Sequence, residues 1–230
     1  MKIAIVGYGK MGRMIERLAV ERGFEVPLKL DEFNNEGYAG ITAQNFCGVD
    51  VAIDFSIPSA AVGNIERIAA LGVNMVIGTT GWLEHEDHVK HVVAEHAVGL
   101  VWSPNYSVGV NAFFRIVNEA AKLLSDKPEY EAWAWEIHHS AKKDAPSGTL
   151  LKLVEEMHAA GYARRVDVAS SRAGTIAGTH EIGFDSAADT ITLRHTARSR
   201  EGFAMGALRA AEWVAGKKGF HEFADILFER

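Results

Sequence analysis

Short apolar runs alternate with helical patterns along the first hundred residues of the chain. Residues 2–6 form an apolar run, and apolar residues at helical spacing follow it over residues 14–19. Further strand-like runs cover residues 25–30, 49–55, 74–77 and 99–102. Strands that alternate with helices predict a doubly wound parallel sheet, so we expect a Rossmann-like α/β domain.

The alternation changes after residue 106. An amphipathic helix is predicted over residues 110–124, and a half-buried strand over residues 130–137, where aromatic and small residues alternate. A helix and three strands are expected next, near residues 150–159, 167–171, 180–184 and 190–196. This order predicts an inserted mixed α+β unit. A helix from about residue 203 to 214 then precedes a short apolar tail.

Composition excludes several functional classes. The chain has 230 residues, of which 48% are hydrophobic, and a net charge of -6. Because phosphate backbones are bound by clustered Lys and Arg, this charge argues against a nucleic-acid partner. Apolar runs stop well short of the roughly 20 residues that a membrane span needs. With the single cysteine Cys47 and no leader-like start, the sequence predicts a cytoplasmic protein without a membrane partner.

A glycine-rich turn follows the first predicted strand and precedes the first helix. It reads Gly7, Tyr8, Gly9, Lys10, Met11, Gly12. In a dinucleotide-binding turn Gly7 permits the tight bend, Gly9 lets the backbone approach a pyrophosphate, and Gly12 lets the helix pack closely on the strand. The alternative is a tight turn between strand and helix that binds nothing.

Asp31 ends the second predicted strand, 19 residues beyond Gly12. In such a fold its carboxylate accepts hydrogen bonds from the ribose hydroxyls, and the neighbouring Glu32 repels the additional phosphate of NADP. NADH is therefore the favoured cofactor. Lys10, Arg13 and Lys29 lie nearby in the sequence and leave NADPH open as well.

Residues 136–149 gather two histidines, two lysines and a Ser-Gly-Thr turn ahead of a helix. Backbone amides at a helix N-terminus suit a carboxylate, and a lysine adds a countercharge, so a dicarboxylate ligand is expected. Hydride transfer to a C=N or conjugated C=C bond builds negative charge that a His or Lys can neutralise. The alternative is a strand end with a polar loop and a capped helix.

The segment 136–149 reads E-x-H-H-x-x-K-x-D-A-P-S-G-T, and with it the chain resembles the dihydrodipicolinate reductase family over essentially its whole length. Further matching segments lie at residues 7–12, 54–56, 78–81, 103–110, 172–180, 195–200 and 203–207. Ser140 and Ala141 depart from the Arg and His of many relatives, which implies a weaker cationic margin of the substrate site.

The resemblance implies roles for individual residues. His138 would act at the reacting centre as an acid or electrostatic partner, and Lys142 as proton donor and substrate contact. The expected ligands of the substrate carboxylates are His139, Ser147, Gly148 and Thr149. Beside the glycine-rich turn and Asp31, the expected cofactor contacts are Phe55, Ser56, Gly78, Thr79, Thr80, Asn105 and Phe203.

The implied activity is reduction of 4-hydroxy-tetrahydrodipicolinate by NADH or NADPH in lysine and diaminopimelate biosynthesis. Residues 1–106 and 206–230 would form the cofactor domain. Residues 107–205 would bind substrate and assemble a homotetramer, with the reaction in the cleft between domains. Two alternatives stay open: a nicotinamide oxidoreductase for another small dicarboxylate, and a dinucleotide sensor without catalysis.

Other histidines and aromatic residues suggest no further site. His85, His88, His91 and His96 share one polar helix whose Glu and Lys neighbours indicate a solvated face, so no metal is predicted. Trp133 and Trp135 project to one face of a strand, where we expect them to pack against a helix or a partner subunit.

Overall fold

The computed structural model describes residues 1–229. The chain divides into two compact units. One comprises Met1–Val108 together with the segment from Glu201 onward, and the other comprises Gly109–Arg200. Within the described range, no helix combines the length and the apolar character that crossing a membrane requires.

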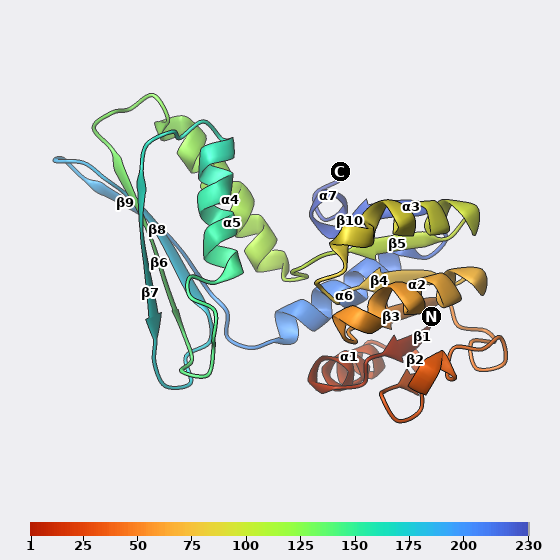
Figure 1. The fold of residues 1–230 in the computed structure, drawn as a ribbon. Coiled ribbons are helices and arrows are strands. Elements are labelled where there is room, and N and C mark those ends of the chain that lie inside the picture. The colour runs from red at the N-terminus through yellow and green to blue at the C-terminus, as the bar shows by residue number, and fades with distance from the viewer. Residues whose placement is uncertain (230) are drawn as a thin grey trace. The chain divides into compact units, whose positions relative to one another are not determined.

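The first unit is built on a parallel sheet of six strands in the order β10-β5-β4-β3-β1-β2 (Figure 1). The strands are β1 (Lys2–Val6), β2 (Glu25–Leu30), β3 (Val51–Asp54), β4 (Asn74–Ile77), β5 (Gly99–Trp102) and β10 (Gly219–Glu222). Every neighbouring pair is parallel, and β1, β3, β4 and β5 are buried along most of their length. Their near-continuous apolar sequences suit a sheet covered on both faces.

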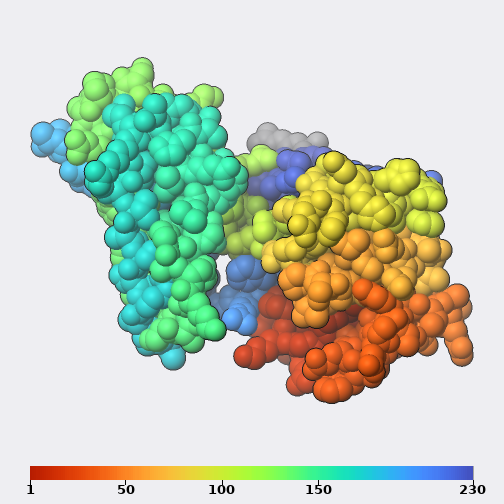
Figure 2. Space-filling model, in the orientation of Figure 1, coloured from red at the N-terminus to blue at the C-terminus, as the bar shows by residue number. Residues whose placement is uncertain are grey.

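Helices cover both faces of this sheet. Alternate residues of β1 point to opposite faces, so Ile3 and Ile5 pack with one layer and Ala4 and Val6 with the other. The first layer contains α1 (Lys10–Glu21), α6 (Glu201–Val214) and α7 (Phe223–Ile226), and the second contains α2 (Pro58–Ala70) and α3 (Glu86–Glu95). In the space-filling view the residues of α2 (orange) and α3 (yellow) lie side by side (Figure 2).

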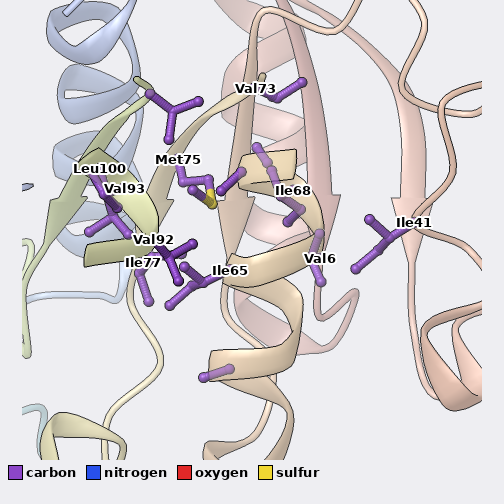
Figure 3. Close-up of a cluster of buried hydrophobic side chains, with 14 of the residues drawn as sticks. Val6, Ile41, Ile65, Ile68, Val73, Met75, Ile77, Val92, Val93 and Leu100 are labelled. Carbon is purple, nitrogen blue, oxygen red and sulfur yellow. The ribbon is translucent and has the colours of Figure 1, made fainter. Parts of the chain in front are cut away.

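The core beneath α2 and α3 consists mostly of aliphatic side chains (Figure 3), together with Met75 and the aromatic residues Phe46, Trp82 and Trp102. Ile65 and Ile68 of α2, with Val92 of α3, are buried against strand residues such as Met75 and Leu100. Burying an aliphatic side chain of this size contributes roughly 1.5–3 kcal/mol, so this layer fixes the sheet that carries the strand ends.

The prediction is incomplete at the end of the chain, where only an apolar tail was expected. Residues 219–222 form β10, which pairs in parallel with β5 from Gly219↔Gly99 to Glu222↔Trp102, and α7 follows it. Four residues are too few to show strand periodicity, and tertiary pairing decides their conformation. Two short 3-10 turns, Glu36–Tyr38 and Leu83–His85, also escape the sequence pattern.

The second unit is a four-stranded mixed sheet with helices on one face (Figure 1). Its strand order is β7-β6-β8-β9, with β6 parallel to β7 and antiparallel to β8. The elements are α4 (Val108–Leu124), β6 (Glu131–His138), α5 (Gly148–Ala159), β7 (Val166–Arg172), β8 (Thr179–Asp185) and β9 (Thr190–Thr196). The predicted parallel sheet with an inserted mixed unit is confirmed.

The tryptophans of β6 lie on the face opposite to α4 and α5. Ala132 and Ala134 are buried in the helix-side core, so the intervening Trp133 and Trp135 point away from it. Trp133 packs against Gly183, where an added Cβ would be 2.0 Å from the indole ring. The expectation of packing against a helix is therefore wrong for the helices of this unit, because strand alternation assigns them the other face.

Candidate active site

The glycine-rich turn joins β1 to α1, and at Gly7 its backbone tolerates only glycine. Gly7 has φ +88°, and a Cβ on it would lie 2.3 Å from the carbonyl oxygen of Phe55. The amides of Gly7 and Tyr8 both donate to the carbonyl of Leu30, at 2.8 and 2.9 Å. The turn is thus tied to the ends of β2 and β3.

Gly12 and Gly9 serve different purposes. A Cβ on Gly12 would lie 2.6 Å from the carbonyl oxygen of Gly7, so glycine is needed for α1 to approach β1. No atom of the described residues lies within 4 Å of a Cβ built on Gly9, so the fold itself does not require glycine there. α1 begins at Lys10 without an acidic residue in its first turn, which leaves its positive end free for an anion.

A cavity of about 400 Å³ lies at the carboxyl ends of the strands of the first unit. Its lining residues are Gly9, Lys10, Met11, Phe55, Ser56, Pro58, Gly78, Thr79 and Thr80. All of them except Pro58 are predicted cofactor contacts. Ligands of open α/β sheets bind at this edge, so the residues present fit a dinucleotide. Pro58 gave no signal beyond that of a helix start.

Asp54 accepts hydrogen bonds from two of the lining residues, Ser56 and Thr79. The carboxylate is fully buried and accepts hydrogen bonds from the Ser56 amide, the Thr79 hydroxyl and the Asn64 amide group, each at 2.8 Å. Burial raises the pKa of Asp54, and these hydrogen bonds oppose the rise. The sequence pattern placed Asp54 at a strand end without indicating this role.

The structure shows contacts of Asp31 and Tyr8 that residue spacing in the sequence did not predict. Asp31 Oδ1 accepts the amides of Phe33 and Asn34, at 2.9 and 3.2 Å, which leaves Oδ2 without a bonding partner among residues 1–229. The hydroxyl of Tyr8 donates to Glu16, whose carboxylate also lies 2.8 Å from the ammonium of Lys29. Glu16 was not predicted, because it lies on an ordinary polar helix face.

Six predicted cofactor residues are not among those lining the cavity: Gly7, Tyr8, Gly12, Asp31, Asn105 and Phe203. Asn105 follows β5, where its Oδ1 accepts the amide of Ser107 at 2.9 Å. Phe203 lies half-buried in the first turn of α6. Their contacts with a cofactor stay predictions.

In the second unit, polar residues form a row across the helix-side face of the sheet. The strand register aligns Ser170, Glu136, His180 and His195 on four adjacent strands. Glu136 is fully buried at its centre. His138 lies two residues further along β6, and its ring covers Gly178, where an added Cβ would be 2.6 Å from Nε2. Only glycine at position 178 leaves room for this ring.

The Glu136 carboxylate accepts hydrogen bonds from three residues, Ser147, Ser170 and Arg172. Oε1 accepts the Ser147 amide at 2.9 Å, the Ser170 hydroxyl at 3.1 Å and the Arg172 guanidinium at 2.8 Å. Oε2 accepts the Ser147 hydroxyl. Burial pushes the pKa of Glu136 upward, but the hydrogen bonds from Ser147 and Arg172 outweigh it, so the pKa lies below its usual value.

Burial makes the histidines beside Glu136 harder to protonate. Burial lowers the pKa of His138, although the Glu136 charge opposes the change. Burial and the neighbouring His138 lower the pKa of His180 to about 4. The two rings meet edge to face with centroids 5.1 Å apart. Burial also lowers the pKa of His195, which stacks on Phe113.

The Ser-Gly-Thr turn begins α5. Ser147 is the N-cap, and its hydroxyl oxygen accepts the amide of Leu150 at 3.2 Å. The amides of Gly148 and Thr149, at the first two helical positions, have no intrahelical acceptor and are available to an anion. Lys142 lies in the preceding loop and pairs with Asp144. The half-buried His139 lies at the start of that loop.

Glu136, His138 and His180 each place one ligand atom within 4.8 Å of the others, as in a metal site. Four hydrogen bonds already occupy the Glu136 carboxylate, and one comes from the positive charge of Arg172. A cation there would displace these donors and face a guanidinium, so we assign no metal to this group.

Two family descriptions match the chain in succession. "Dihydrodipicolinate reductase, N-terminus" matches residues 1–106, and "Dihydrodipicolinate reductase, C-terminus" matches residues 109–227. The resemblance found in the sequence is therefore confirmed over nearly the whole chain.

Curated relatives are similar over most of their length. A 4-hydroxy-tetrahydrodipicolinate reductase of Christiangramia forsetii is 33% identical over 239 residues, covering 99% of this chain and 98% of the relative. One of Archaeoglobus fulgidus is 35% identical over 260 residues, covering 99% and 100%. One of Methanosarcina barkeri is 42% identical over 194 residues, covering 77% and 73%.

Solved structures share the fold. A dipicolinate-bound dihydrodipicolinate reductase from Paenisporosarcina sp. TG-14 has a TM-score of 0.83 at 20% identity, covering 98% of this chain and 99% of that one. GenD2 from gentamicin A biosynthesis, in complex with NAD, has a TM-score of 0.58 at 11% identity, covering 99% and 90%. The sequence matches and this architecture lead to one conclusion: the chain belongs to the dihydrodipicolinate reductase family.

Proposed function

We propose that this protein reduces 4-hydroxy-tetrahydrodipicolinate to tetrahydrodipicolinate with a nicotinamide dinucleotide, in lysine and diaminopimelate biosynthesis. The observation that carries the proposal is the arrangement of residues 138–149. A buried histidine, a partly exposed lysine and a helix N-terminus with free amides lie on one unit of a chain from this family. The free amides and the lysine suit the carboxylates of a dicarboxylate, and the histidine or the lysine can supply the proton that completes the reduction.

The first unit would hold the cofactor. The pyrophosphate is assigned to the free N-terminus of α1 and to the open backbone at Gly9, and the nicotinamide half to the cavity lined by Phe55, Gly78 and Thr80. When bound, the reduced nicotinamide supplies the hydride. Asn105 and Phe203 are proposed to contact the same half of the cofactor.

The second unit would hold the substrate and handle the proton. One substrate carboxylate is assigned to the Ser147 turn with the amides of Gly148 and Thr149, and His139 is a further carboxylate contact. Lys142 would leave Asp144 for the substrate and donate the proton that follows hydride transfer. His138 would stabilise the charge that develops at the reacting ring.

The family uses a nicotinamide dinucleotide, and we propose NADH as the better cofactor of this member. Asp31 keeps one carboxylate oxygen available for ribose hydroxyls. The ammonium of Lys29 is neutralised by Glu16, which weakens its attraction for an additional phosphate. Lys10 and Arg13 form no ion pair within the described part of the chain, so NADPH use is also expected.

We further propose a homotetramer and a cytoplasmic location. The helix-free face of the second sheet presents Trp133 and Trp135, and an aromatic sheet face suits a subunit interface. Light scattering is expected to give a mass near four times 25.1 kDa, and Trp135→Lys is expected to reduce it. The exposed free thiol of Cys47 suits a reducing compartment.

The reductase activity is tested by following nicotinamide absorbance with freshly prepared 4-hydroxy-tetrahydrodipicolinate. Rapid oxidation of NADH is expected, and His138→Ala is expected to reduce it strongly while the variant stays folded. An intact protein that binds NADH but does not turn over would exclude this function. Turnover of another small dicarboxylate instead would reassign the substrate.

A further inference from the structure

Glu136 is a buried charge for which the proposed reaction has no role. Its Oε1 is fully used by Ser147, Ser170 and Arg172. Its Oε2 accepts the Ser147 hydroxyl and also faces two imidazoles, 3.5 Å from His138 Nδ1 and 3.4 Å from His180 Nε2. Burying a carboxylate costs several kcal/mol of desolvation, so the buried position of Glu136 calls for a physical explanation.

One carboxylate touches both parts of the site. Through two hydrogen bonds from Ser147 it holds the N-cap of α5, and thereby the orientation of the free amides at Gly148 and Thr149. Through Oε2 it faces the ring of His138 at the reacting centre. A displacement of the carboxylate would therefore disturb the substrate anchor and the histidine together.

His138 has one obvious acceptor for a proton on Nδ1. This nitrogen is buried and forms no hydrogen bond to any described residue, and Glu136 Oε2 is the carboxylate oxygen that faces it. An ionised carboxylate attracts the N–H of an imidazole and repels its lone pair, so it selects the tautomer with the proton on Nδ1. Nε2 is then the nitrogen that exchanges protons.

We propose that Glu136 is a positioning residue, which fixes His138 with its proton on Nδ1 and at the same time holds the Ser147 turn that anchors a substrate carboxylate. This deepens the proposed function and rests on it for the substrate. The Glu136 charge also favours the imidazolium form of His138 over what burial alone would allow. The arrangement corresponds to a carboxylate that orients a catalytic histidine without exchanging protons itself.

The charge of Glu136 acts on His138 together with others. The titratable and charged groups that face His138 are Glu136 on its own strand, Arg172 on β7, His180 on β8, and Lys142 and Asp144 in the following loop. Glu136 and Asp144 favour the charged imidazole, whereas Lys142 and Arg172 disfavour it. Removing the Glu136 charge leaves two cations against one carboxylate, so His138 should become harder to protonate.

The variant that tests this is Glu136→Gln, which keeps the shape and removes the charge. With its amide nitrogen at the place of Oε2, Gln would donate to His138 Nδ1 and reverse the tautomer. Glu155→Gln is the matched control, because it removes an exposed carboxylate of α5 whose one ion-pair partner among residues 1–229 is Lys152. Nitrogen NMR of labelled histidine, recorded on the intact protein without substrate, reports the tautomer and the titration midpoint of His138.

In the unaltered protein, neutral His138 is expected to carry its proton on Nδ1. In Glu136→Gln the proton should move to Nε2, and the titration midpoint should fall by roughly one pH unit. Glu155→Gln should change neither. The acidic limb of the kcat/KM profile should shift in the same direction, and KM for the substrate should rise roughly tenfold because the Ser147 turn loosens.

Two results would overturn the proposal. One is a neutral His138 with its proton on Nε2 in the unaltered protein, which needs no variant and so decides even where Glu136→Gln fails to fold. The other is an unchanged tautomer and midpoint in folded Glu136→Gln. Absence of substrate turnover would remove the reductase function, while the histidine spectra would still decide the role of Glu136.

Discussion

The ammonium group of Lys142 lies against both carboxylate oxygens of Asp144, at 2.8 and 2.9 Å. The pair holds the lysine in one place, and the exposed Asp144 can be replaced as its partner by a substrate carboxylate. Lys142→Ala is expected to lower kcat by a factor of roughly 10² to 10⁴, the usual loss for a general acid. Steady-state NADH oxidation measures the effect.

Lys143→Ala is the control for this prediction, because Lys143 is the exposed neighbour of Lys142 in the same loop. It should leave kcat within about a factor of two, since an exposed charge contributes little. Equal losses in the two variants would mean that general positive charge, and not the proton of Lys142, supports the reaction.

Gly9→Ala and Gly12→Ala should separate cofactor binding from folding. A Cβ on Gly9 meets no described atom, so its thermal midpoint should stay near that of the unaltered protein while the Kd for NADH rises at least about tenfold. A Cβ on Gly12 would lie 2.6 Å from a backbone oxygen, so that variant should lose about 1–3 kcal/mol of stability. Unaltered NADH binding by Gly9→Ala would place the pyrophosphate elsewhere.

Stability should fall as pH falls because of His180. Burial and His138 lower the pKa of this histidine from 6.5 to about 4 in the folded protein. Between these values the unfolded chain binds a proton that the folded chain does not, so acidification favours unfolding, by at most about 3 kcal/mol. The stability that comes from the depressed pKa of Glu136 is fully present above about pH 4.5, the ordinary pKa of the group, and is lost only as the pH falls below that value.

Urea unfolding at about pH 7 and about pH 5 tests this linkage. His180→Gln should reduce the pH dependence over that interval without abolishing it, because the pKa values of His138 and His195 are also lowered. His91→Gln, a change at an exposed histidine of α3, should leave the dependence as it is. A dependence that persists fully in His180→Gln would assign the linkage to another group.

Glu16→Gln should shift the choice of cofactor toward NADPH. The change removes one negative charge beside Tyr8 and releases Lys29, so a 2′-phosphate would meet a less acidic surface. We expect the ratio of the Kd for NADPH to that for NADH to fall by roughly threefold to tenfold. Glu21→Gln, on the same helix and paired with Arg17, is the control. An unchanged ratio would show that the Glu16 pair does not influence the phosphate.

Much of the fold followed from local pattern. Alternating apolar runs and helical spacing predicted the parallel sheet, because buried strands and amphipathic helices carry their burial in their residue period. The turn from Gly7 to Gly12 was equally predictable from sequence, because a side chain at Gly7 or Gly12 would clash with nearby backbone atoms. The family was readable from the motif at residues 136–149.

Other features depend on partners that lie far away in the sequence. β10 is a strand because β5 offers it an edge, and Asp54 supports Ser56 and Thr79 only once β3 and β4 lie side by side. Glu136 belongs to the motif at residues 136–149, but nothing in the sequence distinguishes it from other acidic residues. Its partners Ser147, Arg172 and His180 are up to 44 residues away, the separation of His180 from Glu136.

The sequence by itself therefore determined the order of strands and helices up to α6 and the glycine-rich turn, and it predicted the site residues of the segment 136–149, because each of these depends on neighbouring positions. The tertiary structure alone decided that a buried carboxylate joins His138 to the Ser147 turn, and that Trp133 and Trp135 face away from the helices. The physical reason is that register and burial arise from contacts between distant segments, and these contacts set which polar groups meet and which charges lose their water.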